Sequence, residues 1–457
     1  LFLPLSTEVI FVFGMTDNRS YALAIVGTCG LPAAYGGFET LAAQLVEYLA
    51  APDFKILIFA QIGYKSFHYK HSSQLALPIR ANGLSSIPYD ITSLVIASLR
   101  CETVLLLGVS GAISLPILRI LFPRVRFVTH IDGVEWSRPK WTSVAKLFLR
   151  LSERFAVHFS DAIIVDNIGI ADYVARSYGR RYLRRCFAVA YGAEDFDSQP
   201  KSLPRHFSVV DGVTNKTIHL PLNKYFLVVA RAEPENNISM AIQAFVFSRL
   251  SDEGFSLVVI SNAFSTLHGS NLIRTFSGFA GVCFAEPVYD SRVVRAIRRG
   301  ALAYVHGHSA GGTNPSLVEA LAAEKPILAF DVPYNRHTTF GLAKYFKTVE
   351  TLSESMLFLV AEGLDVVPEL IYLSRMNYNW SSVTMAYRRL FSTLSERGSL
   401  GISLILARFV LRLSHKMLFQ LNVFVESLRI KLVNIGAQYD PSISEAGTDE
   451  KPGPSVH

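Results

Sequence analysis

The chain has 457 residues, of which 50% are hydrophobic and 18% charged, and it carries a net charge of +7. This length predicts two or three domains, and the apolar content allows each to bury a large core. The positive charge favours an anionic partner, either nucleotide phosphates or an anionic membrane surface, over the alternative of ordinary surface variation. Nucleic acid is the least favoured partner, since the aromatic and basic signature of its binding proteins is missing.

The four cysteines occur without a CxxC pair, so the sequence implies neither a disulfide framework nor a metal site. They are typical of buried small residues in a reducing compartment. They are Cys29, Cys101, Cys186 and Cys283.

The chain starts with "LFLPLSTEVIFVFG", which lacks the basic start and the cleavage signature of a signal peptide. The run is also too short to span a membrane. We therefore expect Met15 to lie close to the true start, with residues 1–14 as upstream translation or a weak anchor.

Strand-like and helical segments alternate through the first half of the chain. The run "YALAIVGTCG" is predicted to be a buried parallel strand that enters a glycine loop, and "FETLAAQLVEYLA" follows with helical spacing. Further strands are expected at "KILIFA", "TVLLLG", "VRFVTHIDG" and "DAIIVD". This alternation predicts an α/β domain with a mostly parallel sheet.

A polar stretch without hydrophobic periodicity, residues 195–222, predicts a domain boundary. A second α/β series starts at "YFLVVARAEPENN" and continues through "FSLVVISN", "GVCFAEPV", "ALAYVHGHS" and "KPILAFDV". Both halves are predicted to be doubly wound, so the expected ligand site is the cleft between them.

Residues 400–437 combine apolar side chains with cations at intervals of about four. This pattern predicts a basic amphipathic helix or helix pair, which either packs on the body or lies on a membrane surface. The stretch after it is polar and rich in Pro and Gly, which predicts disorder. The cations are Arg408, Arg412, Lys416, Arg429 and Lys431, with Glu426 as the acid among them.

The first glycine loop, "GTCGLPAAYGGFET", has neither the G-x-G-x-x-G spacing of dinucleotide-binding folds nor a P-loop lysine. Because it follows a strand and opens a helix, its backbone N–H groups can meet a substrate or a phosphate. A plain tight turn is the alternative. Its candidate residues are Gly30, Tyr35, Gly36, Gly37 and Glu39.

The second glycine loop, "GHSAGGTNPSLVEAL", has the features of a diphosphate seat. Its glycines allow close approach to a ligand, its Thr or Asn can cap a helix, and its proline suits the first helical turn. The helix start supplies N–H groups and partial positive charge. Glu319, one turn further on, can accept hydrogen bonds from ribose hydroxyls, although a solvent-facing acid is the alternative. The candidate donor-binding residues are Gly311, Gly312, Thr313, Asn314, Pro315 and Ser316.

Two further stretches carry polar side chains at strand ends. Arg231 comes directly off a strand in "VVARAEPENN", where a guanidinium can neutralise a leaving diphosphate, and Asn236 lies in the loop that follows. In "VTHIDGVEWSRPKW", His130, Asp132 and Glu135 follow a first-domain strand, where α/β ligand sites occur. Each alone is more often structural, but together they are candidates for binding the transferred sugar or the acceptor.

At these stretches the chain resembles the GT-B glycosyltransferases of family four, and more narrowly their rhamnosyltransferase-like branch. The matching segments occur in the family's order over residues 20–395. They are "GTCGLPAAYGGFET", "DGVEWSRPKW", "VDNIGIADYV", "ARAEPENN" and "YVHGHSAGGTNPSLVEAL".

The resemblance implies a retaining sugar transfer without a metal or other cofactor, and no Asp-x-Asp pair is suitably placed for a metal. It implies that Arg231 contacts the donor phosphate and that Glu319, matching the second acid of the E-x7-E motif, holds the donor ribose. With His130 and Asp132, these are the predicted catalytic residues. The predicted division is an uncertain extension (1–19), an acceptor-side Rossmann-like domain (20–200), a linker (201–222), a nucleotide-sugar-binding Rossmann-like domain (223–397), a basic amphipathic helical segment (398–437) and a disordered tail (438–457).

Two positions depart from the family pattern. The first acid of E-x7-E would fall at Gly311, and the lysine usual five residues after the arginine is Asn236. Neutralisation of the donor phosphates then depends on Arg231 and on backbone N–H groups from Gly312 to Ser316.

The favoured function is transfer of a hexose, with rhamnose as a candidate, from a nucleotide-diphosphate sugar to a lipid-linked or polysaccharide acceptor. We expect a cytoplasmic enzyme, peripheral on the inner face of the cell membrane. The two departures leave one alternative, a catalytically weakened nucleotide-sugar-binding subunit that partners an active glycosyltransferase. An epimerase is disfavoured, because no pair of carboxylates can be assigned to its chemistry.

Overall fold

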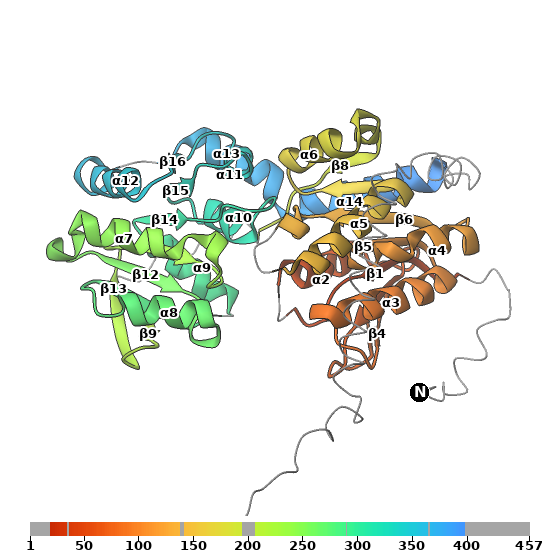
Figure 1. Cartoon of the computed structure of the whole chain (residues 1–457), viewed down its shortest axis with the longest axis horizontal. Helices are drawn as coiled ribbons and strands as arrows, with labels where there is room; N and C mark the ends of the chain where they lie inside the picture. Colours follow the sequence, from red (N-terminus) through yellow and green to blue (C-terminus); the bar gives the residue numbers. More distant parts are fainter. Residues whose placement is uncertain are drawn as a thin grey trace, which may run out of the picture. The chain divides into compact units, whose positions relative to one another are not determined.

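Two mostly parallel sheets organise the residues described by the computed structural model (Figure 1). Within this part of the chain, no helix is both long and apolar enough to cross a membrane. The basic amphipathic segment predicted at 398–437 and the tail after it lie outside the described residues. The structure describes residues 19–33, 36–137, 141–193, 206–288, 290–363 and 366–397.

The first sheet has eight strands in the order β3-β4-β2-β1-β5-β6-β7-β8, and β3–β4 is its one antiparallel pair. Its central strands are buried apolar runs, as expected for a sheet covered on both faces. The strand order reverses at β1, which pairs with β2 on one side and β5 on the other. The strands are β1 (Tyr21–Val26), β2 (Ile56–Ala60), β3 (Phe67–Tyr69), β4 (Ser72–Ala76), β5 (Cys101–Leu107), β6 (Arg126–Ile131), β7 (Ala162–Val165) and β8 (Cys186–Ala188).

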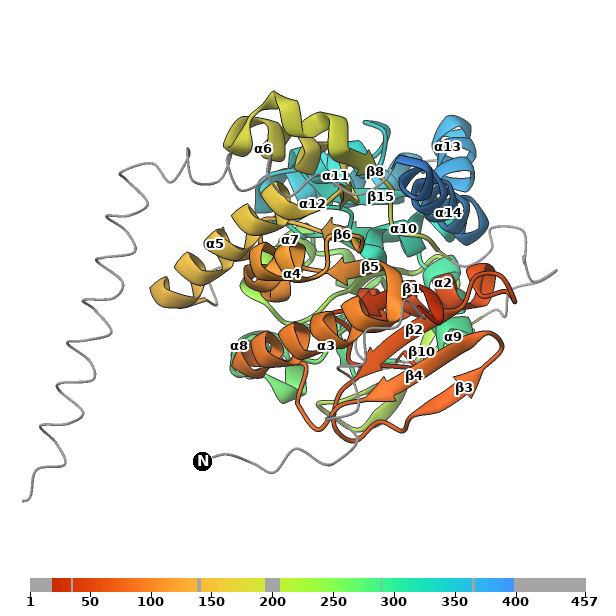
Figure 2. The same ribbon diagram turned by 90° about the vertical axis from the view of Figure 1, so that its right-hand side faces the viewer.

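Helices cover both faces of the first sheet. Apolar residues of α2 and α14 share one core with residues of β1, β2 and β5. Figure 2 shows α3, α4 and α5 on the other face of the sheet. The helices are α2 (Gly37–Leu49), α3 (Ser86–Arg100), α4 (Leu115–Leu121), α5 (Ser143–Phe159), α6 (Ile168–Tyr178) and α14 (Trp380–Arg397).

The second sheet has eight strands in the order β10-β9-β13-β12-β11-β14-β15-β16. The strands from β13 to β16 in this order are parallel, and their order reverses at β11, which pairs with β12 and β14. The strands are β9 (His206–Asp211), β10 (Lys216–Pro221), β11 (Tyr225–Val229), β12 (Ser256–Ile260), β13 (Val282–Ala285), β14 (Ala303–His306), β15 (Ile327–Phe330) and β16 (Lys344–Phe346).

The second sheet is also doubly wound. Helices α9, α10 and α13 contribute to the core on one face, and α7, α8 and α12 to the core on the other. The prediction of two doubly wound α/β domains is therefore confirmed. The helices are α7 (Ile238–Ser248), α8 (Leu267–Phe276), α9 (Ser291–Gly300), α10 (Pro315–Ala322), α11 (Pro333–Thr338), α12 (Val349–Glu362) and α13 (Pro368–Tyr378).

The predicted linker at 201–222 is wrong for its described part, because β9 and β10 form an antiparallel hairpin at the edge of the second sheet. The hairpin joins the sheet where Asp211 pairs with Ala285 of β13. The Asp211 carboxylate stabilises the turn by accepting from Val213 N at 3.2 Å and from Thr214 Oγ1 at 2.7 Å. The sequence of this hairpin resembles that of a linker because a hairpin at a sheet edge exposes polar side chains to water.

The last described helix does not belong to the domain that the sequence assigned to it. Trp380, Val383 and Tyr387 of α14 pack in the first domain's core, beside β1 and α2. Where the chain enters this helix, Asn379 forms a bridge with Ala193. The predicted domain 223–397 therefore loses α14 to the first domain, because the apolar side of this helix fits that sheet.

Candidate functional site

The candidate site lies where the strand order of the second sheet reverses, at the carboxyl ends of β11 and β14. The loops that follow these strands are joined by hydrogen bonds. Asn237 Nδ2 donates to Gly307 O at 2.8 Å, and Ser309 N donates to Glu235 O at 2.8 Å. Asn237 has φ +48°, a left-handed conformation that asparagine tolerates better than most residues. The two loops therefore form one platform.

The start of α10 has the predicted capping. Asn314 Oδ1 accepts a hydrogen bond from Ser316 N at 2.9 Å, and Pro315 occupies the first helical turn. The Ser316 hydroxyl donates to Val229 O, at the end of β11, at 2.8 Å. The first turn of α10 is thus held against the strand that leads to Arg231.

Arg231 lies two residues after the end of β11 and is exposed. Asn236 Nδ2 donates to the carbonyl oxygen of Arg231 at 2.7 Å, which stabilises the backbone of this loop. Among the described acids, none forms an ion pair with Arg231. A guanidinium without a carboxylate partner is suited to bind an anion.

Glu319 has a partner that the sequence did not reveal. Its carboxylate accepts from Arg298 Nη2 at 2.6 Å, and the Arg298 side chain, 6% exposed, belongs to α9. The same nitrogen lies 3.2 Å from Ser316 Oγ. The Glu319 side chain remains 39% exposed, so its carboxylate is held in place while part of it faces solvent. The sequence of α9 does not reveal the pairing of Arg298 with Glu319, because only tertiary packing brings α9 and α10 together.

His130 is buried at the end of β6, 4% exposed. Its Nδ1 lies 3.2 Å from the hydroxyl of Tyr387 on α14, and its ring centroid is 5.6 Å from that of Phe38. Burial lowers the pKa of His130 to about 4, so its imidazole is neutral near pH 7. A contact of His130 with a substrate stays a prediction.

The two glutamates of the acceptor-side prediction both have structural partners. Glu39, 4% exposed, accepts from Cys29 N at 2.8 Å and so joins the first turn of α2 to the glycine loop. Glu135 Oε1 accepts from the indole of Trp141 at 3.0 Å. These contacts orient both carboxylates, and a direct role toward an acceptor stays a prediction.

The glycines of the first loop are needed for close packing. A Cβ on Gly30, which has φ +113°, would lie 2.4 Å from Ala60 Cβ. A Cβ on Gly37 would lie 3.1 Å from Pro315 Cγ, so the start of α2 touches the start of α10. Gly36 is the residue before α2, and Tyr35 lies outside the described residues.

The second glycine loop contacts the first domain at Asp132 and Asp166. Gly312 N donates to Asp132 O at 3.0 Å. Thr313 N donates to Asp166 Oδ2 at 3.1 Å, and the Thr313 hydroxyl donates to Asp166 O at 2.5 Å. A Cβ on Gly312 would lie 2.0 Å from Asp166 Oδ1, so only glycine fits. Thr313 therefore bonds to the first domain, while Asn314 caps the helix.

Asp166 was not among the predicted site residues. Burial raises the pKa of its carboxyl group well above the usual range, and the nearby charge of Asp132 adds to this effect. Its place directly after β7, within the family-like segment "VDNIGIADYV", was a usable signal.

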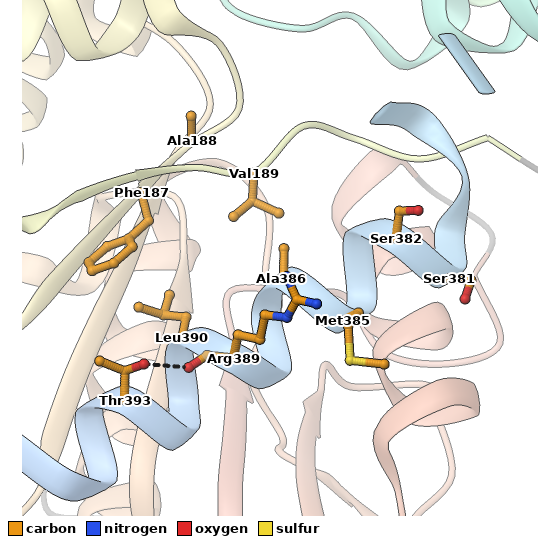
Figure 3. A pocket seen from close by; sticks show the side chains of 10 residues that line it. All are labelled: Phe187, Ala188, Val189, Ser381, Ser382, Met385, Ala386, Arg389, Leu390 and Thr393. Carbon is orange, nitrogen blue, oxygen red and sulfur yellow. Dashed lines mark hydrogen bonds between the residues drawn. The ribbon is translucent and has the colours of Figure 1, made fainter. Parts of the chain in front are cut away.

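A pocket of about 490 Å³ lies between β8 and α14 (Figure 3). Phe187, Val189 and Leu390 give it an apolar side, and Arg389 and Ser381 a polar one. It contains none of the predicted site residues. The candidate site is therefore defined by the strand-end loops and not by this pocket.

Comparison with known proteins identifies solved structures that have a similar fold. A family model described as "Domain of unknown function (DUF1972)" matches residues 21–194. No curated protein sequence matches the chain. Among solved structures, sucrose-phosphate synthase from Thermosynechococcus elongatus is 14% identical with a TM-score of 0.64, and the match covers 82% of this chain and 100% of that one.

Two further solved structures are similar. Anabaena HepE in complex with UDP is 13% identical with a TM-score of 0.57, and the match covers 82% of this chain and 100% of HepE. The α,α-trehalose 6-phosphate synthase from Burkholderia multivorans is 10% identical with a TM-score of 0.59, with 83% and 98% covered. The described chain therefore has the two-domain GT-B fold of these proteins.

Proposed function

We propose that the protein is a glycosyltransferase that uses a nucleotide-diphosphate sugar. One observation supports this most strongly: the capped start of α10 is bonded to the end of β11, and Arg231 follows that strand. Among the predicted N–H donors, those of Gly312, Thr313 and Ser316 already donate to Asp132, Asp166 and Asn314. The guanidinium of Arg231, which forms no ion pair with a described acid, is therefore the main support for a bound diphosphate. Anabaena HepE, of similar fold, has been solved with UDP and with UDP-glucose.

In the proposed reaction the bond between the anomeric carbon and the diphosphate breaks, and the acceptor hydroxyl attacks from the same face of the sugar. Arg231 and the start of α10 stabilise the charge that develops on the leaving diphosphate. Glu319, oriented by Arg298, binds the donor ribose. His130, Asp132 and the loop from Gly30 to Glu39 shape the acceptor side.

The finer assignment follows the resemblance of the sequence motifs to the rhamnosyltransferase-like branch. We propose a retaining, metal-independent transfer of a hexose such as rhamnose to a lipid-linked or polysaccharide acceptor. In the described part of the chain, His, Cys, Asp and Glu side chains form no group of three or more that could hold a metal ion. Independence from metal stays a prediction, which activity after treatment with a chelator would test.

The deciding experiment measures release of nucleoside diphosphate from dTDP-rhamnose, UDP-glucose and GDP-mannose, with and without a lipid extract. Lipid-dependent release from one donor is expected and would identify that donor. Donor binding without release under any condition would instead favour the alternative, a nucleotide-sugar-binding subunit of another transferase. The departures from the family pattern at Gly311 and Asn236 are the reason for that alternative.

We also propose that the protein binds the inner face of the cell membrane through the basic segment 398–437. The support is the charge of +7 and the cations of that segment among apolar residues. Deleting residues 398–457 is expected to abolish flotation with anionic vesicles, whereas deleting 438–457 alone should leave flotation intact. If the variant that lacks residues 398–457 still floats with the vesicles, the membrane contact must lie in the first domain.

A further inference from the structure

The pocket between β8 and α14 lies where the last strand of the first sheet faces one side of a helix (Figure 3). Phe187 and Val189 point from β8 toward α14, whereas Ala188 between them points away, as the alternation of a strand requires. Six of the helix residues that line the pocket follow one another at intervals of one, three or four, so they share one side of α14. They are Ser382, Met385, Ala386, Arg389, Leu390 and Thr393.

The core of the first domain covers only one side of α14. Trp380, Val383 and Tyr387 are buried in that core. On the side of the pocket, Met385 is 48% exposed, and Phe187 on the opposite wall is half-buried. The cavity of about 490 Å³ has a volume that is usual for small-molecule sites. An apolar group that enters it would therefore gain free energy by removing these side chains from water.

The pocket also carries positive charge. Arg389 is the one charged residue among the ten that line it. Arg389 is exposed and forms no ion pair with an acid of the described part of the chain. Figure 3 shows its side chain extending along α14 toward Ala386 and Met385, so the guanidinium borders the apolar wall. A guanidinium without a carboxylate partner is suited to bind the oxygens of a phosphate.

These two features together select the class of ligand. A free phosphate would pair with Arg389 but would leave the apolar wall in water. A neutral hydrocarbon would cover the wall but would leave the guanidinium without an anion. A ligand that combines an apolar chain with a phosphate satisfies both parts of the pocket, and the charge of the lining favours it because no acid is present to repel the phosphate.

We propose that the pocket between β8 and α14 binds a lipid phosphate, with the apolar chain against Phe187 and Met385 and the phosphate on Arg389. The pocket contains no residue of the strand-end loops, so this site does not depend on the nucleotide-sugar donor. Two kinds of molecule share the required chemistry, a prenyl phosphate that carries a glycan and a glycerol-based membrane phospholipid.

Calorimetry on the full chain, with n-octyl phosphate, 1-octanol and inorganic phosphate as separate ligands, tests the proposal. We expect octyl phosphate to bind more tightly than either of the others. Arg389→Gln should weaken octyl phosphate about tenfold and leave the weaker binding of octanol unchanged. The matched control is Arg388→Gln, which removes the same charge from an exposed neighbour outside the pocket and should leave all three affinities unchanged.

A second variant tests the apolar wall. Ser382 is an exposed lining residue, so Ser382→Trp should fill part of the pocket without disturbing the core, and it should weaken octyl phosphate and octanol alike. Thermal unfolding at the wild-type temperature would show that the variant is folded. Unchanged binding of octyl phosphate to folded Ser382→Trp would place its site elsewhere and overturn the proposal.

The remaining outcomes are equally decisive. Equal weakening of octyl phosphate by Arg388→Gln and Arg389→Gln would indicate general attraction to positive charge and contradict a site at Arg389. Inorganic phosphate that binds as tightly as octyl phosphate would contradict a role of the apolar wall, and a wild type that does not bind octyl phosphate would rule the site out. If the site is present, tighter binding of geranyl phosphate than of octyl phosphate assigns it to prenyl phosphates, and equal affinity assigns it to membrane phospholipids.

Discussion

Replacing Arg231 with alanine is expected to lower kcat about a hundredfold, equivalent to about 3 kcal/mol of transition-state stabilisation. Arg231 is exposed after β11, the strand whose end is bonded to the first turn of α10, and no described acid forms an ion pair with it. Because Asn236 stands where the resembling family has a lysine, the proposed site depends mainly on Arg231 for positive side-chain charge toward the diphosphate. Release of nucleoside diphosphate from whichever of the three donors the wild type uses measures the effect.

Two matched variants separate this effect from a general loss of positive charge. Arg231→Lys keeps the charge without the planar fork and should give an intermediate rate. Arg274→Ala removes an exposed arginine of α8 that bonds only locally, to Asn271 at 3.1 Å, and should leave kcat unchanged. Turnover of Arg231→Ala at the wild-type rate would show that the leaving group is stabilised elsewhere.

Replacing Asp161 with alanine is expected to lower the free energy of unfolding by about 3–5 kcal/mol. Asp161 forms an ion pair with Arg119 in which the two side chains are 5% and 2% exposed. Its carboxylate also accepts from Phe127 N, at the start of β6, at 2.8 Å. Alanine would leave the Arg119 guanidinium charged and buried, with the carbonyl oxygens of Phe159 and Val125 as hydrogen-bond acceptors but no carboxylate. Urea unfolding followed by circular dichroism measures the loss.

The surface ion pair between Glu47 and Lys70 provides the control, since its side chains are 51% and 38% exposed. Glu47→Ala should cost less than about 1 kcal/mol, because water and salt already screen that pair. The double variant Arg119→Met, Asp161→Leu should be more stable than Asp161→Ala, since it removes the buried charge as well as its partner. Equal losses for Asp161→Ala and Glu47→Ala would contradict burial of the pair.

The strands that sequence patterns predicted are those in the middle of each sheet. Runs such as "KILIFA" and "YFLVVA" are apolar throughout because helices cover both sides of those strands, as β2 and β11 show. The short strands β3, β4, β8 and β16 and the hairpin of β9 and β10 were missed. They lie at or near sheet edges, and β10 exposes most of its residues. At an edge the hydrophobic pattern weakens, because one side of the strand faces water.

The loops of the candidate site were predictable because their chemistry is local. The glycines, the asparagine cap and the proline at the start of α10 are consecutive in sequence, and each has a local physical reason to occur there. The partners of these loops were not predictable. Arg298 beside Glu319, Asp166 beside Thr313 and Tyr387 beside His130 come from other elements, and the last two pairs are 147 and 257 residues apart.

The sequence by itself determined the two α/β halves and the strand-end loops, because these depend on periodicity and on short-range backbone chemistry. Only the tertiary structure decided that α14 joins the first domain and that β9 and β10 belong to the second sheet. Those outcomes depend on how surfaces from distant parts of the chain pack together, and local residue patterns do not predict that packing.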